Sequence, residues 1–91
     1  MERERAMTNE SYADSIRKVV VKNNIEVATI DKLKELTLLY RQERNLLRPD
    51  DFEITKSGGK KWEGRVRSAL MTLRQNGEAA LIGRAKYRFF I

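Results

Sequence analysis

The sequence has no cysteine and no histidine among its 91 residues. Without cysteine there is no disulfide framework, and without either residue the usual zinc ligands are missing. No apolar run approaches the roughly 20 residues that a membrane-spanning helix needs. The first ten residues, MERERAMTNE, alternate acids and bases and lack the apolar segment of a signal peptide. We therefore expect one domain without a cofactor or a membrane partner, located in the cytoplasm.

Positive charge is in excess, and it is concentrated in one part of the chain. The formal net charge is +6. Residues 1–55 hold ten bases and eleven acids, whereas residues 56–91 hold nine bases and only two acids, Glu63 and Glu78. Basic residues usually form a solvated surface that keeps a chain soluble. Their concentration in one segment of this chain instead favours a polyanionic partner. We expect that partner to be a nucleic acid, which would associate the chain with the nucleoid.

Apolar spacing predicts a first helix over residues 12–22 and a second helix after residue 29. Ser11 with Asp14 resembles a capping box for the first helix, and Asn23-Asn24 ends it. Thr29 or Asp31 can cap the second helix, whose end is expected between residues 40 and 47. Its expected apolar face consists of Leu33, Leu36, Leu39 and Tyr40.

A third helix is predicted within KKWEGRVRSALMTLRQNG, residues 60–77, with Gly77 as its left-handed C-cap. A short extended piece is expected over residues 25–28. Residues 48–59 are expected to form a loop with a short strand over 52–54. A β-hairpin is expected from strands 79–82 and 87–91 around a turn at 83–85.

Three helices followed by a C-terminal hairpin are the element order of an α+β winged helix-turn-helix. We expect this domain to span residues 11–91, after a disordered tail over residues 1–10. The chain shows no internal repeat and no low-complexity linker.

One face of the third helix carries polar groups only. At about 100° per residue, the stripe consists of Lys61, Arg65, Ser68, Thr72 and Gln75. The core face is expected to consist of Trp62, Val66, Ala69, Leu70 and Leu73. Arg suits guanine, Gln suits adenine, and Ser or Thr suits a base edge or a phosphate. A solvated outer face is the alternative interpretation, although such faces usually mix Glu with Lys.

Residues beside the stripe extend this hypothesis. Lys60 and Lys61, at the start of the helix, suit phosphates, and Gly64 would let a DNA backbone approach closely. Trp62 could contact a base or a methyl group, but its angle favours the core.

The hairpin carries alternating cations, Arg84, Lys86 and Arg88, which should project from one side and neutralise phosphates. Protection of an edge strand by charge would also explain them. Tyr87, Phe89 and Ile91 should take the other side and pack on the helices.

No catalytic site is expected in this chain. Pro49-Asp50, Glu53 and Lys56 resemble a PD…(D/E)xK nuclease signature, but Thr55 stands at the lysine position. The two halves are almost adjacent, and the chain has no room for the α/β core of such an enzyme. No phosphate-binding loop and no nucleophile–base pair is visible.

The segments VRSALMTLRQNG and GRAKYRFFI resemble the winged-helix domain of methyladenine-dependent type II restriction endonucleases, including the one that cuts methylated GATC. There, a helix of the form (I/V)R…L..LR..G leads into a hairpin ending near RG.YR. The matching residues are Val66, Arg67, Leu70, Leu73, Arg74, Gly77, Arg84, Tyr87 and Arg88. Ala85 replaces the expected glycine. The resemblance covers residues 60–91, about a third of the chain.

This resemblance implies a reader of double-stranded DNA that senses N6-methyladenine in the major groove with Lys61, Arg65, Ser68 and their neighbours. It also implies a restriction-modification role as one domain of a larger enzyme, linked to a nuclease part that this chain lacks. Two other hypotheses stay open: a free-standing transcription regulator of the same fold, and a winged helix used for protein–protein contact. The sequence gives neither the target site nor the oligomeric state.

Overall fold

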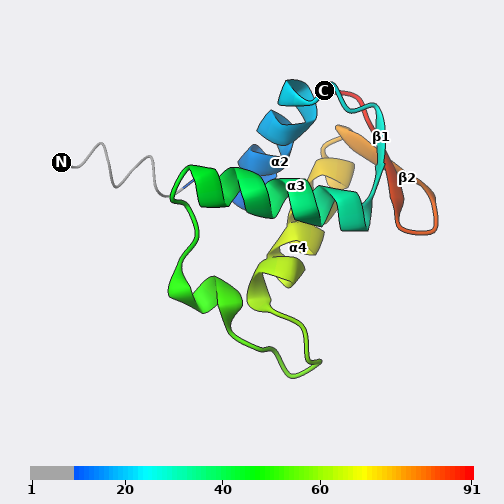
Figure 1. Ribbon diagram of the computed structural model, residues 1–91. Helices are drawn as coiled ribbons and strands as arrows, with labels where there is room; N and C mark the ends of the chain where they lie inside the picture. Colours follow the sequence, from blue (N-terminus) through cyan, green and yellow to red (C-terminus); the bar gives the residue numbers. More distant parts are fainter. Residues whose placement is uncertain (1–9) are drawn as a thin grey trace.

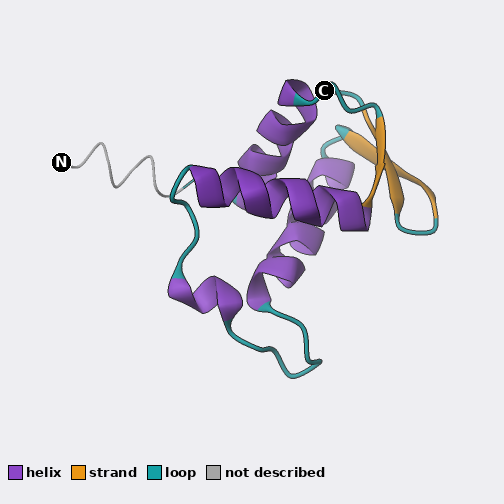
Figure 2. Ribbon diagram, viewed as in Figure 1, coloured by secondary structure: helices purple, strands orange, loops and turns teal. Residues whose placement is uncertain are grey.

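A computed structural model describes residues 10–91, and it shows an α+β fold (Figure 1). The elements are α2 (Tyr12–Lys22), β1 (Val27–Thr29), α3 (Ile30–Glu43), the 3-10 helix η1 (Pro49–Phe52), α4 (Lys61–Gln75), β2 (Ala79–Gly83) and β3 (Lys86–Phe89). Figure 2 shows the three longer helices grouped together, with the sheet at one side of them. The α+β class and the three helices are as predicted. The expected tail covers residues 1–10, of which residues 1–9 lie outside the described residues.

Local capping explains where α2 and α3 begin and where all three helices end. The Ser11 and Thr29 hydroxyls accept hydrogen bonds from the third residue beyond them, at 3.1 and 3.2 Å. Each helix then ends in a residue with a positive φ, namely Asn24 (54°), Asn45 (60°) and Gly77 (78°). The next amide bonds back to the last turn in all three, as in Ile25 N to Val20 O (2.9 Å). The Gly77 cap was predicted, whereas Asn45 as the end signal of α3 was missed.

The sheet has the strand order β1-β3-β2, with both pairings antiparallel. The hairpin of β2 and β3 is therefore confirmed, with small shifts in its bounds. The extended piece expected over residues 25–28 is found as β1, slightly later in the chain, because it pairs with β3. This pairing makes β3 the central strand.

The core lies between the helices and the inner face of the sheet. Its buried members come from α2, α3, α4 and the hairpin: Ile16, Val20, Leu33, Trp62, Val66, Ala69, Leu70, Leu73, Ala79 and Phe89. All five predicted core residues of α4 are among them, including Trp62, which is 8% exposed. Tyr87 and Phe89 pack inward as predicted, but the prediction was wrong for Ile91, which is 48% exposed.

The predicted apolar face of α3 was wrong at Leu39, which is 49% exposed. Thr37 and Arg41 are buried instead. Arg41 is accommodated because its guanidinium donates to Glu10 O (2.9 Å), Ser15 Oγ (2.8 Å) and Leu46 O (3.3 Å). It also lies 3.9 Å from the centre of the Tyr12 ring. A buried arginine thus joins the start of α2 to the end of α3.

Glu10 lies one residue before the predicted domain boundary, yet it contacts the folded part. Its carboxylate accepts from Ser15 Oγ and Lys18 Nζ, each at 2.8 Å. Burial alone would raise the pKa of Glu10, but these hydrogen bonds outweigh it and lower the pKa. Glu10 is therefore held against α2 by these two contacts.

The segment between α3 and α4 contains η1 where a short strand over 52–54 was expected. Only Ile54 pairs, in an isolated bridge with Lys60. The turn beyond it is closed by Thr55 N to Gly59 O (2.7 Å), and Gly58 has a φ of 93°. Pro49 at the first position of η1 favours a helical turn over a strand. As a result, Asp50 and Asp51 lie beside α4.

Candidate nucleic-acid interface

The predicted polar stripe of α4, which we call the Lys61 stripe (Lys61, Arg65, Ser68, Thr72, Gln75), lies on the surface, but acids cover its cations. Lys61 Nζ lies 2.8 Å from Glu53 Oε1, and Arg65 Nη2 lies 3.0 Å from Asp50 Oδ2. Arg65 Nη1 also binds Asp51. The helix face itself carries no acid, as the sequence showed. The connecting segment supplies three acids from outside the helix, which the wheel could not reveal.

Asp51 is the anchor of this arrangement. It is only 1% exposed, and its other carboxylate oxygen accepts from Arg48 N at 2.8 Å. The hydrogen bond from Arg65 lowers the pKa of Asp50, and the same bond raises the pKa of Arg65. Arg65, 39% exposed in its side chain, is thus held in one orientation by two carboxylates.

The uncharged members of the Lys61 stripe are exposed, as is Gly64. Thr72 uses its hydroxyl within the helix, donating to Ser68 O at 3.2 Å. A Cβ added at Gly64 would meet no atom within 4 Å, so packing within the chain does not require glycine there. Ser68 and Gln75 make no side-chain hydrogen bond to another described residue.

Both acids of the basic segment bind cations from elsewhere in the chain. Arg17 on α2 makes a two-point contact with Glu78, at 2.7 and 2.8 Å. This contact lowers the pKa of Glu78. Lys34 on α3 lies 4.0 Å from Glu63. Neither acid is therefore paired with the positive charge of its own segment.

Seven of the nine cations in residues 56–91 make no ion pair with a described residue. Only Lys61 and Arg65 do. The seven are Lys56, Lys60, Arg67, Arg74, Arg84, Lys86 and Arg88, all exposed. Lys60 Nζ lies 6.0 Å from the centre of the Phe52 ring. Lys60 and the three hairpin cations are predicted site residues, whereas Arg67 and Arg74 lie on α4 outside the predicted Lys61 stripe.

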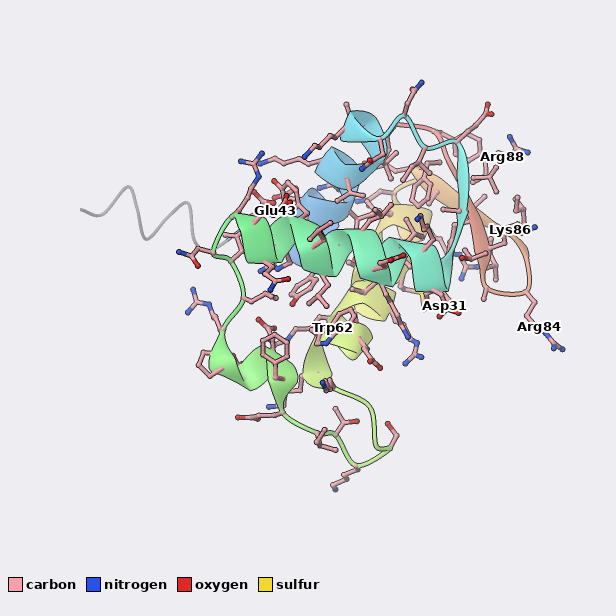
Figure 3. All side chains as sticks on the ribbon, viewed as in Figure 1. Asp31, Glu43, Trp62, Arg84, Lys86 and Arg88 are labelled. Atoms are coloured by element: carbon pink, nitrogen blue, oxygen red, sulfur yellow. The ribbon has the colours of Figure 1, made fainter. Side chains whose placement is uncertain are left out.

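The hairpin displays its cations away from the helices (Figure 3). Lys86 stands opposite Thr29, and Arg88 stands opposite Val27, with β2 on the other side. Because β3 has a partner strand on each side, edge protection was the wrong explanation for these two residues. Arg84 lies in the turn that joins the strands.

The hairpin turn is fixed to α3. Ile30 N, at the start of that helix, donates to Ala85 O at 2.8 Å. Ala85 has a φ of 54°, a conformation that favours glycine. This is the position at which the restriction-enzyme pattern has glycine. The departure adds local strain but leaves the turn in place.

The residues of the nuclease-like signature serve other contacts. Asp50 binds Arg65 and Glu53 binds Lys61. Within residues 10–91, no group of three or more acids is placed to hold a metal ion.

No protein-family model matches this chain, and neither the curated proteins nor the solved structures that were compared with it give a match. Among the helices of residues 10–91, none is both long enough and apolar enough to span a bilayer.

Proposed function

We propose that this chain is a winged helix that binds double-stranded DNA, with α4 as the recognition helix and the β2–β3 hairpin as the wing. The observation that carries the proposal is the set of seven exposed cations on α4, on the segment before it and on the hairpin that make no ion pair with any of residues 10–91. Such a set is suited to phosphates, which dominate the affinity of proteins for nucleic acids.

The shape of α4 supports a duplex as the partner. Its 15 residues make a helix about 22 Å long. A helix of this size fits the major groove, which is about 12 Å wide. The sheet lies beside α4 and presents Lys86 and Arg88 on its outer face, where a groove-bound helix would bring the phosphate backbone (Figure 3).

The proposed fold departs from the simplest helix-turn-helix in one respect. Residues 44–60 separate α3 from α4, whereas the usual turn has three or four residues. The extra length forms η1 and the turn after it. The angle between two packed helices is set by how their side chains interdigitate, so a longer connection is compatible with the same arrangement of α3 and α4.

The modified base is the finer part of the proposal, and the resemblance to methyladenine-dependent restriction enzymes supports it. Under this hypothesis, the chain is the target-recognition module of a modification-dependent endonuclease and has no catalytic site of its own. The test is fluorescence anisotropy with three labelled duplexes of one GATC-containing sequence. They carry no, one or two N6-methyladenines and are titrated at two salt concentrations.

We expect tighter binding to the methylated duplexes that persists at the higher salt. Equal binding to all three, falling steeply with salt, would leave a DNA-binding winged helix without methyl reading, as in a transcription regulator. Absence of binding at both salts would overturn the DNA proposal and favour a winged helix used for protein–protein contact.

A further inference from the structure

The exposed surface of α4 is wider than the Lys61 stripe. At about 100° per residue, a second stripe lies roughly 100° around the helix from it. We call it the Arg67 stripe; it consists of Gly64, Arg67, Met71 and Arg74, which fall within about 40° of a common direction. All four are exposed, and Met71 is 52% exposed.

The two stripes differ in whether their cations are paired with acids. In the Lys61 stripe, both cations bind acids of the connecting segment. In the Arg67 stripe, neither cation has an acid partner among residues 10–91. Each stripe contains two cations, so the difference lies in their neighbours and not in their number.

The acids beside the Lys61 stripe would also meet DNA. The side chains of Asp50 and Glu53 are 43% and 58% exposed. A duplex placed against Lys61 and Arg65 would bring phosphates close to these carboxylates, and like charges repel at such a distance. A duplex placed against the Arg67 stripe avoids them.

The position of the hairpin favours the same orientation. Lys34 on α3 pairs with Glu63 on α4. Glu63 lies one helical turn before Arg67, so the two side chains are neighbours on the helix surface. The first residue of α3 holds the hairpin turn through Ala85 O. The Arg67 stripe therefore lies on the side of α4 that faces the first turn of α3, where the hairpin is attached. Figure 1 shows η1 on the other side of α4.

We infer that α4 faces the duplex with the Arg67 stripe, rotated away from η1, and that Arg67 and Arg74 supply its main DNA contacts. Ser68 and Gln75 lie on the side of the Lys61 stripe that is nearer to the Arg67 stripe, and they stay within reach of base edges. Lys61 and Arg65 instead fix η1 against the helix. This inference rests on the proposed function, because it assigns the DNA-facing side of the same helix.

Two double variants with equal loss of charge test it. Arg67→Ala with Arg74→Ala should weaken duplex binding by about 10- to 100-fold and lower the salt slope by about two. Lys61→Ala with Arg65→Ala should weaken it by less than about threefold. Anisotropy titrations over a range of salt concentrations measure both effects, and Trp62 fluorescence verifies that each variant is folded.

Removing Arg65 leaves the buried Asp51 unpaired, so that double variant could unfold. Lys61→Ala alone is then compared with Arg67→Ala alone, since Lys61 binds only the exposed Glu53 among the described residues. An equal or larger loss for the Lys61 and Arg65 changes would overturn the inference and leave DNA binding intact. If the unaltered chain does not bind a duplex at low salt, the proposed function itself fails.

Discussion

Arg65 Nη2 and Asp50 Oδ2 lie 3.0 Å apart, joining the helix α4 to the 3-10 helix that precedes it. This pair lowers the pKa of Asp50 below its ordinary value of 3.8. A carboxylate with a lowered pKa in the folded state stabilises the fold above its unfolded pKa. That stabilisation is lost as pH falls through the folded pKa.

Asp50→Asn should therefore reduce the acid sensitivity of the fold. We expect the free energy of unfolding to decline less between pH 5 and about pH 2 in this variant than in the unaltered chain. Urea unfolding followed by Trp62 fluorescence measures it. Asp31→Asn, at a carboxylate that makes no ion pair with a described residue, is the matched control. Identical acid profiles for Asp50→Asn and the unaltered chain would show that the pair does not act in solution.

Tyr12 should lose its phenolic proton at a higher pH than an ordinary tyrosine. Burial and the nearby charge of Asp51 raise the pKa of Tyr12 to about 12. Because the unfolded chain releases this proton near pH 10, stability is retained below pH 10 and declines between pH 10 and 12. The ultraviolet absorbance of tyrosinate should show a late transition that Tyr12→Phe removes. A variant that keeps the transition unchanged would assign it to another tyrosine.

Ala85→Gly should stabilise the fold by about 1 kcal/mol. Ala85 has a φ of 54°, where a side chain strains the backbone and glycine does not. Ala80→Gly in β2 is the control, and it should destabilise by about 0.5–1 kcal/mol because glycine weakens a strand. Urea unfolding of both variants gives the comparison, and the prediction fails if the two changes have the same sign.

Arg41→Met should destabilise the fold by about 2–4 kcal/mol, since it removes three hydrogen bonds and leaves buried acceptors without a donor. Methionine keeps much of the volume, so lost packing contributes little. Arg44→Met, at an exposed cation that begins the turn after α3, should cost less than about 1 kcal/mol. Thermal unfolding measures the stability of both variants. A similar loss of stability at the two positions would show that the hydrogen bonds of Arg41 do not stabilise the fold.

Asp31→Asn should strengthen duplex binding by about two- to threefold. Figure 3 shows Asp31 at the end of α3 that adjoins the hairpin cations, where it would repel phosphates. Glu43→Gln at the opposite end of α3 changes the net charge equally and should leave the affinity within about 1.5-fold. Anisotropy at low salt compares them. Equal gains would mean that net charge alone matters and that the hairpin side is not the DNA side.

Sequence alone predicts much of this fold because its signals are local. Ser11, Thr29 and Gly77 act within a few residues of where they stand, and the core face of α4 follows from helical periodicity. The predictions fail where a side chain is stabilised by residues that are distant in the sequence. The burial of Arg41 depends on Glu10 and Leu46, and no periodicity of α3 contains that information.

The candidate site shows the same limit. A helical wheel correctly finds the exposed arc of α4, but it weighs only residues of that helix. Whether a cation is free depends on Asp50, Asp51 and Glu53, which approach Lys61 and Arg65 only after η1 forms. Which stripe has cations without acid partners among residues 10–91 is therefore visible only in the three-dimensional structure.

The place of β3 between β1 and β2 has a consequence for the order of folding. β1 pairs with residues about 60 positions later in the chain, and such distant contacts form slowly. During synthesis, α2 and α3 can form early, but β1 has no partner until residues 86–88 have been made. Phe89, which closes the core, is available only then. A shortened chain that stops after β2 would leave two unpaired strands and an open core, and chaperones and proteases would bind or degrade it.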